Sequence, residues 1–152
     1  MSIQNVMTVC VGNICRSPVA EGLLAQALPL CKVWSSGLHA VVGAPADPTA
    51  QALALDAGVD ISAHRAQQVQ AWMCTQADLI LVMEASHQRE LVQRFPLARG
   101  KIRLLGEFGS EYASTPYDIA DPYQQSRAMF EAVHASITKG VTQWSRRIRL
   151  VV

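Results

Sequence analysis

The sequence lacks both a long apolar segment and an excess of either charge. No stretch approaches the roughly 18 consecutive apolar residues that a transmembrane helix needs, so no membrane insertion is expected. Charged side chains make up only 16% of the 152 residues, and 13 basic against 12 acidic residues leave a formal net charge of +1. Because both signs are scattered along the chain, we expect no broad basic face for nucleic acid. Any selectivity for an anion must therefore be local.

Cysteine is also scarce. Cys10, Cys15, Cys31 and Cys74 are irregularly spaced and form no CxxC pair. This pattern indicates neither a structural zinc site nor the disulfide framework of a small secreted domain. The N-terminal segment has no positively charged start and no small-residue cleavage site, so export is not indicated. We therefore expect a cytoplasmic protein that holds no metal and no cofactor.

Apolar residues make up half of the chain and recur at the spacings of alternating strands and helices. The length suits a single domain over residues 1–152. Strands are predicted over residues 6–11, 32–35, 78–83 and 102–105. Helices are predicted from Ser17-Pro18 onward, from Asp47-Pro48 to Gly58, over residues 66–74 and 86–95, and along a C-terminal apolar stripe from Phe130 to Trp144. The alternation predicts a three-layer α/β/α fold with a central four-stranded parallel sheet.

Four residues carry more specific structural expectations. Ser17 can cap the first helix, and Pro18 fits its first position, where a missing N–H costs nothing. Trp72 and Trp144 are interpreted as packing residues.

The segment from Cys10 to Ser17 reads CVGNICRS and joins the first predicted strand to the first predicted helix. Loops that follow parallel strands lie at the carboxyl edge of the sheet, where ligands bind. The backbone N–H groups of a tight, glycine-containing loop and of the next helix can converge on an oxyanion. Arg16 adds a planar fork that can hold two phosphate oxygens. The sequence therefore predicts a phosphate-binding loop after the first strand.

The same electrostatic field would stabilise Cys10 as a thiolate, the form in which cysteine is a nucleophile. Cys10 could then attack phosphorus directly. Phosphoryl transfer gains mainly from positioning and from stabilising charge in the transition state, and this loop could supply both. We therefore predict a covalent mechanism that requires no metal.

A phenolate leaving group departs more easily when an acid protonates it, and two Asp-Pro pairs could supply that acid. Asp47-Pro48 and Asp121-Pro122 both precede helical patterns, so either carboxylate could instead be a helix cap. The sequence pattern does not separate the two. Tyr123 follows the second pair and could line a slot for a phenyl ring, which favours Asp121.

Three motifs, VCVGNICRSP, Ser35-Ser36-Gly37 and Asp121-Pro122-Tyr123, resemble the low-molecular-weight protein tyrosine phosphatase family. The resemblance extends over essentially the whole chain. It implies hydrolysis of phosphotyrosine through a cysteinyl-phosphate intermediate, with Cys10 as nucleophile, Arg16 as phosphate clamp and Asp121 as general acid that later activates water. The phosphate-binding residues that it implies are Val11, Gly12, Asn13, Ile14, Cys15, Arg16 and Ser17.

The resemblance also implies roles for residues around the loop. Asn13 would hold the loop in a strained conformation, and Ser17 would donate a hydrogen bond to the sulfur of Cys10. Ser35 and His64 match family positions that brace the loop.

Two further segments, GLHAVVGAPADPTA and ADPYQQSRAMFE, are most similar to a bacterial branch of the family. That branch pairs with autophosphorylating tyrosine kinases that control exopolysaccharide or capsule export. Val41 stands where other branches carry a bulky aromatic residue, and Gln124 stands where animal members usually have a second tyrosine after Tyr123. We therefore expect Val41 and Tyr123 to line the substrate slot of a monomer that acts on a phosphotyrosine protein, a tyrosine autokinase.

Two other functions fit parts of the pattern. A thiol-dependent arsenate reductase would resemble the same fold, but such an enzyme needs further cysteines, and only Cys74 lies beyond Cys31. A non-catalytic anion-binding module would keep Arg16 but would need no nucleophile or acid. Cys15 is interpreted either as a packing residue or as the partner of Cys10 in a protective disulfide.

Overall fold

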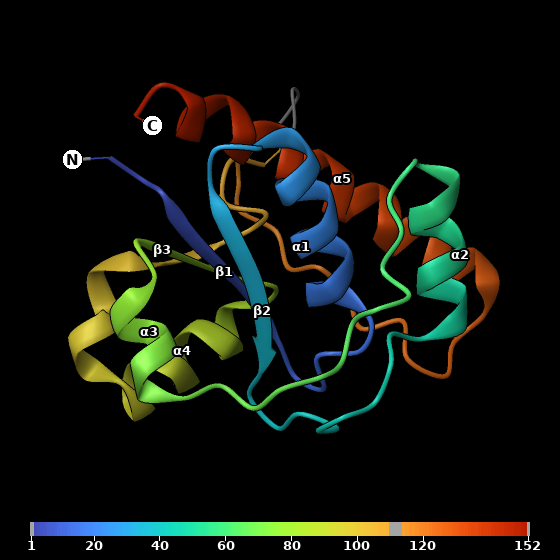
Figure 1. Cartoon of the computed structure of the whole chain (residues 1–152), viewed down its shortest axis with the longest axis horizontal. Coiled ribbons are helices and arrows are strands. Elements are labelled where there is room, and N and C mark those ends of the chain that lie inside the picture. Colours follow the sequence, from blue (N-terminus) through green and yellow to red (C-terminus); the bar gives the residue numbers. More distant parts are fainter. Residues whose placement is uncertain (1, 110–113, 152) are drawn as a thin grey trace.

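The computed structural model describes residues 2–109 and 114–151 as an α/β fold around a parallel sheet (Figure 1). Its strands are β1 (Asn5–Cys10), β2 (Lys32–Gly37), β3 (Leu79–Val82) and β4 (Ile102–Leu104). They lie in the order β2-β1-β3-β4, and each neighbouring pair is parallel. The predicted four-stranded parallel sheet is therefore confirmed.

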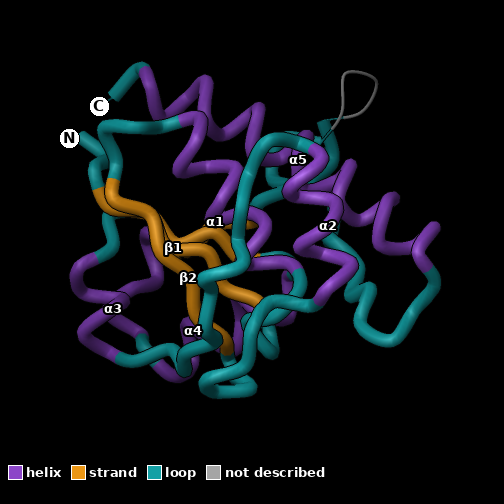
Figure 2. The backbone as a smooth tube through the Cα atoms, turned by 45° about the vertical axis from the view of Figure 1, so that its right-hand side comes forward, coloured by secondary structure: helices purple, strands orange, loops and turns teal. Residues whose placement is uncertain are grey.

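Helices cover both faces of this sheet, as Figure 2 shows. On one face lie α1 (Arg16–Ala27), α2 (Pro48–Asp56) and α5 (Arg127–Arg149), which contact one another. The other face is covered by α3 (Ala71–Gln76), α4 (Ala85–Arg94) and the 3₁₀ helix η1 (Pro96–Lys101). The predicted three-layer arrangement is therefore also confirmed.

The side chains of β1 alternate between two hydrophobic cores. Val6 and Cys10 lie in the core beneath α1, α2 and α5, whereas Met7 and Val9 lie in the core beneath α3 and α4. All four residues of β3 are buried, as expected for a central parallel strand covered on both faces. Cys10 therefore points toward the layer that contains α1.

The apolar stripe on α5 packs on the sheet as predicted. Phe130, Val133, Ile137, Val141 and Trp144 are all buried, and the indole N–H of Trp144 donates to the carbonyl of Leu104 at 3.0 Å. Neither α5 nor any other helix within residues 2–109 and 114–151 has the length and hydropathy needed to cross a bilayer.

The helix predicted over residues 66–74 is wrong at its start. α3 begins only at Ala71, because the preceding residues pair with the end of β2. The N–H of Val69 donates to the carbonyl of Gly37 at 2.9 Å, and Gly37 forms an isolated bridge with Gln68. Trp72, predicted to be a packing residue, is 53% exposed on this short helix.

The predicted start of the first helix also needs correction. α1 begins at Arg16 with Cys15 as its N-cap residue, so Ser17 is already helical and Pro18 is the third helical residue rather than the first. Ser17 is fully buried. Its hydroxyl is therefore directed into the protein rather than used as a helix cap.

The strand order explains where a ligand can bind. β2 lies on one side of β1, and β3 and β4 lie on the other, so the chain leaves β1 and β3 in opposite directions. In open parallel sheets such a switch point opens a crevice at the carboxyl ends of the strands. Residues 11–15 follow β1 and residues 83–84 follow β3 at this crevice.

Candidate active site

The loop from Cys10 to Arg16, called the Cys10–Arg16 loop below, is fastened through its carbonyl groups. The carbonyls of residues 10, 11 and 12 accept from the N–H groups of Leu38, His39 and Val41 at 2.9–3.0 Å, and the Ile14 carbonyl accepts from Asp47 at 2.8 Å. None of the described hydrogen bonds uses a backbone N–H of residues 11–15 as donor. The loop therefore turns its acceptors toward the protein and leaves its donors available, as in loops that bind anions.

Close approach of β2 makes this fastening possible. A Cβ atom at Gly37 would lie 2.5 Å from the carbonyl oxygen of Val11. Only glycine allows the two backbones to pack this closely. The glycine of the Ser35-Ser36-Gly37 motif is thus explained by its contact with the loop.

Asn13 lies at the centre of a buried hydrogen-bond network. Its φ of 59° is in the left-handed region, which asparagine tolerates better than most residues. The side-chain amide donates to the hydroxyls of Ser17 at 2.7 Å and Ser35 at 3.0 Å. Its amide oxygen accepts from the N–H of Gln67, and its carbonyl lies 2.7 Å from Nε2 of His64. Every polar group of Asn13 in this network stabilises the strained turn.

The hydroxyl of Ser17 connects this network to the sulfur of Cys10. Ser17 Oγ lies 2.9 Å from Cys10 Sγ, and both residues are buried. Because Asn13 already donates to Ser17 Oγ, the hydroxyl hydrogen is free to point at the sulfur. The backbone carbonyl of Ser17 also accepts from the hydroxyl of Thr8 at 2.9 Å, which ties the first turn of α1 to β1.

The side chain of Arg16 is buried, with only 2% of its surface exposed. Its Nη1 donates to Glu84 Oε2 and to the carbonyl of Ile119, both at 2.8 Å. Its Nη2 lies 3.8 Å from Asp121 Oδ2. The guanidinium therefore joins the end of β1, the end of β3 and the segment that precedes α5.

The two candidate acids lie in different environments. Asp47 caps α2, since its carboxylate accepts from the N–H groups of Thr49 and Ala50. Asp121 does not precede a helix directly, because α5 begins six residues later with Ser126 as its N-cap. The side chain of Asp121 is 51% exposed and faces the guanidinium of Arg16. The structure thus brings Asp121, and not Asp47, beside Arg16.

Comparison with known proteins identifies the family. The model for low molecular weight phosphotyrosine protein phosphatases matches residues 5–150. The chain belongs to this family. It is 44% identical over 147 residues, 97% of each chain, to the probable low molecular weight protein-tyrosine-phosphatase EpsP of Ralstonia nicotianae. It is 42% identical over 144 residues, 95% of each chain, to the low molecular weight protein-tyrosine-phosphatase Wzb of Escherichia coli strain K12.

Solved structures agree with this assignment. The crystal structure of the Erwinia amylovora tyrosine phosphatase AmsI matches with a TM-score of 0.88 at 43% identity, and covers 95% of this chain and 93% of its own. These findings confirm the resemblance drawn from the sequence, and with it the prediction of a protein-tyrosine phosphatase. They do not favour the arsenate reductase alternative.

The phosphatase chain holds a second cysteine inside the Cys10–Arg16 loop. Cys15 is 5% exposed, and burial, reinforced by the negative charge of Asp47, raises the pKa of its thiol to about 12. Cys15 is therefore a neutral thiol at physiological pH. All four cysteines are free, so the disulfide between Cys10 and Cys15 considered from the sequence stays a hypothesis.

The two residues predicted to line the phosphatase's substrate slot are both at the surface. Val41 is 51% exposed, and its N–H donates to the carbonyl of Gly12 in the loop. Tyr123 is 48% exposed, and its N–H donates to Asp121 Oδ1 at 3.0 Å. Each is thus attached to one side of the crevice, Val41 to the loop and Tyr123 to the acid.

Sequence reasoning missed several residues around this phosphatase site. Glu84 bonds Arg16, His87 contacts Glu84, and Glu21 accepts from the Ser35 hydroxyl at 2.6 Å. Of these three residues, only Glu84 has a position in the chain that could have predicted its place at the site. Glu84 follows a buried parallel strand, and polar residues there meet the loop after β1 when the strands are neighbours.

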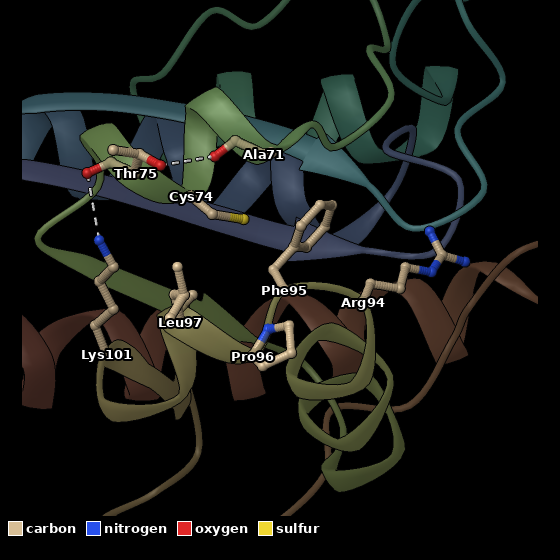
Figure 3. A pocket seen from close by; sticks show the side chains of 9 residues that line it. Ala71, Cys74, Thr75, Arg94, Phe95, Pro96, Leu97 and Lys101 are labelled. Carbon is tan, nitrogen blue, oxygen red and sulfur yellow. Dashed lines mark hydrogen bonds between the residues drawn. The ribbon is translucent and has the colours of Figure 1, made fainter.

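A separate cavity of about 420 Å³ lies on the other face of the sheet, between α3 and the α4–η1 segment (Figure 3). The sulfur of Cys74 points toward Phe95 inside it. Burial raises the pKa of the Cys74 thiol, so this sulfur is not a ready nucleophile. Because Cys10, Arg16 and Asp121 are absent from its lining, the cavity does not belong to the candidate active site.

Proposed function

We propose that this phosphatase hydrolyses phosphotyrosine in protein substrates through a phosphocysteine on Cys10. The observation that carries the proposal is the meeting of three groups in one crevice. The Cys10 sulfur lies 2.9 Å from the Ser17 hydroxyl, the Arg16 guanidinium is buried at the other end of the same loop, and the Asp121 carboxylate lies 3.8 Å from that guanidinium.

In the first step the Cys10 thiolate attacks phosphorus, the S–P bond forms and the bond from phosphorus to the tyrosine oxygen breaks. Asp121, in its protonated form, donates a proton to the departing oxygen. The N–H groups of residues 11–15, which donate none of the described hydrogen bonds, and the guanidinium of Arg16 stabilise the charge on the equatorial oxygens. The products are a dephosphorylated tyrosine side chain on the substrate protein and a cysteinyl phosphate on the enzyme.

In the second step water attacks the phosphocysteine. Asp121, now a carboxylate, accepts a proton from this water, the new P–O bond forms and the S–P bond breaks. The electron pair returns to the Cys10 sulfur, and the hydrogen bond from Ser17 stabilises the thiolate that leaves. Inorganic phosphate then departs, and Asp121 is again protonated for the next cycle.

We assign the remaining predicted residues by their contacts. Val11, Gly12, Asn13, Ile14, Cys15 and Ser17 would form the phosphate cradle together with Arg16. Ser35 and His64 would brace it, since both hydrogen-bond to Asn13. Val41 and Tyr123 would line opposite sides of the slot for the phenyl ring.

We further propose that residues 1–152 act as one domain and that the enzyme is a cytoplasmic monomer. Its substrate would be an autophosphorylated bacterial tyrosine kinase that controls exopolysaccharide or capsule export. The similarity to EpsP, Wzb and AmsI supports this assignment, together with the GLHAVVGAPADPTA and ADPYQQSRAMFE segments.

Hydrolysis of p-nitrophenyl phosphate in the presence of EDTA tests the mechanism. The protein should turn over without added metal, and Cys10→Ser should lower kcat by at least about 10⁴-fold because serine is not a thiolate. Rapid acid quenching during turnover should trap phosphate on the peptide that contains Cys10. Normal turnover by Cys10→Ser would refute the mechanism.

A further inference from the structure

The N-cap residue of α4 has a side chain that forms no hydrogen bond with the first turn of its helix. Glu84 is the N-cap residue, yet its carboxylate makes no capping hydrogen bond. Asp118 takes over that task, because its Oδ1 accepts from the N–H of Ala85 at 2.9 Å. An N-cap side chain normally satisfies a free N–H of its own first turn. The Glu84 carboxylate is therefore free for other partners.

Both partners of Glu84 meet at one oxygen. Oε2 accepts from Arg16 Nη1 at 2.8 Å and lies 3.0 Å from Nε2 of His87, one turn further along α4. An ionised carboxylate only accepts hydrogen bonds, so the imidazole must carry its hydrogen on Nε2. His87 and Arg16 thus hold the same oxygen from two directions.

His87 is held as a neutral imidazole. Its side chain is 5% exposed, and burial together with the charge of Arg16 lowers its pKa against the opposing effect of Glu84, Glu90 and Asp118. Its Nδ1 is buried without a partner among the described residues. A protonated ring would bury an N–H with no acceptor, whereas the neutral ring leaves only a lone pair unpaired.

We propose that His87 is a positioning residue of the phosphatase reaction, which acts by holding the Glu84 carboxylate against the Arg16 guanidinium. The inference rests on the proposed function, since it concerns the residue that would clamp the phosphoryl group. Nothing in the chemistry of phosphoryl transfer requires His87 itself to touch the substrate.

The surroundings of Arg16 explain why Glu84 needs a second hydrogen-bond donor. Glu84 is 31% exposed on a flexible side chain, so without the second donor its carboxylate can turn to water. Arg16 would then be left with the Ile119 carbonyl and with Asp121 3.8 Å away. A guanidinium that moves toward Asp121 is misplaced for phosphate, and misplacement of about 1 Å can cost up to roughly 10²-fold in rate.

Three substitutions separate positioning from packing. His87→Leu removes the donor and fills the buried space, His87→Met does the same with a more adaptable side chain, and His87→Gln keeps an N–H near the position of Nε2. The matched control is His134→Leu. His134 also has an unpartnered Nδ1 and a pKa lowered by burial, but none of the described hydrogen bonds or ion pairs joins its ring to Glu84 or Arg16.

We expect His87→Leu and His87→Met to lower kcat/KM for p-nitrophenyl phosphate about tenfold and to weaken inhibition by inorganic phosphate by a similar factor. The kcat/KM of His87→Gln should stay within about threefold of the parent value. The kcat/KM of His134→Leu should equal that of the parent protein. The Tm of the Leu variant should not fall, because the substitution also removes a buried, unpaired nitrogen. In a Glu84→Gln background, His87→Leu should cause no further loss.

Wild-type kcat/KM and phosphate inhibition in both His87→Leu and His87→Met would overturn the inference. So would a loss in His87→Gln as large as in His87→Leu, or losses by Glu84→Gln and His87→Leu that simply multiply. The proposed function fails separately. If Cys10→Ser is inactive in the same assay while the His87 variants behave normally, only the role of His87 is refuted.

Discussion

The Cys10–Arg16 loop and the segment around Asp121 face each other across one crevice, yet they are built differently. Cys10, Asn13 and Arg16 are no more than 2% exposed and lie within a hydrogen-bond network. Asp121 and Tyr123 are about half exposed. The segment is fixed near Ile119, whose N–H donates to the Met83 carbonyl at 2.8 Å.

The difference agrees with the roles proposed for the two regions. Groups that stabilise charge in a transition state work best when they are rigid before the substrate arrives, because no energy is then lost in reorganising them. A group that takes up and releases a proton in every cycle needs access to water. Burial therefore suits the loop, and partial exposure suits Asp121.

Among the changes that test this comparison, the largest effect should come from replacing the buried guanidinium of Arg16. Arg16→Lys keeps the positive charge but loses the planar pair of donors, so it cannot bond Glu84, Ile119 and phosphate in the same geometry. We expect kcat/KM for p-nitrophenyl phosphate to fall by about 10³-fold. Arg127→Lys is the control, because Arg127 forms an exposed ion pair with Glu131 and should behave as the parent protein.

The loop should be intolerant of change at its strained residue. Asn13→Ala removes bonds to Ser17, Ser35 and Gln67 and leaves a left-handed residue unsupported. Urea unfolding should show a loss of about 3 kcal/mol. Gln124 has a similar φ of 61° in an exposed turn, and Gln124→Ala should change stability by less than about 0.5 kcal/mol. Equal losses at both sites would show that the network adds nothing to the fold.

Substitution of Asp121 should change the activity of the protein but not its stability. Asp121→Ala should lower kcat by about 10²-fold while the free energy of unfolding stays within about 0.5 kcal/mol of the parent value. Asp47→Ala should do the reverse, with a stability loss of about 1 kcal/mol from the missing α2 cap and little change in kcat. A stability loss in Asp121→Ala as large as that in Asp47→Ala would contradict the contrast between the two regions.

The smallest effect concerns His134 on α5. Burial lowers its pKa in the folded protein below the ordinary 6.5. At a pH below 6.5, His134 binds a proton in the unfolded chain but binds it less well in the folded protein. The free energy of unfolding therefore falls as the pH drops. Urea titrations at about pH 7.5 and about pH 5.5 should show a smaller drop for His134→Leu, by up to about 1 kcal/mol. An equal drop in both proteins would show that His134 titrates normally.

Much of the fold could be predicted because its signals are local. The apolar run over residues 78–83, the α5 stripe and the Asp47-Pro48 helix start each depend on neighbours within a few turns or strand residues. The errors arose where distant segments compete for the same backbone. Residues 66–70 pair with the end of β2 instead of joining α3, and the Ser17 hydroxyl serves Cys10 instead of capping α1.

The sequence by itself determined the chemistry that is available, since the Cys10–Arg16 loop is a contiguous motif between a strand and a helix. Only the tertiary structure decided which acid faces Arg16, and which buried partners hold it. Asp47 and Asp121 both precede a proline, and although Tyr123 favoured Asp121, the local pattern places neither beside Arg16; Glu84 and His87 belong to no motif. Their proximity to Arg16 arises from the order β2-β1-β3-β4, which brings the ends of β1 and β3 together at one crevice.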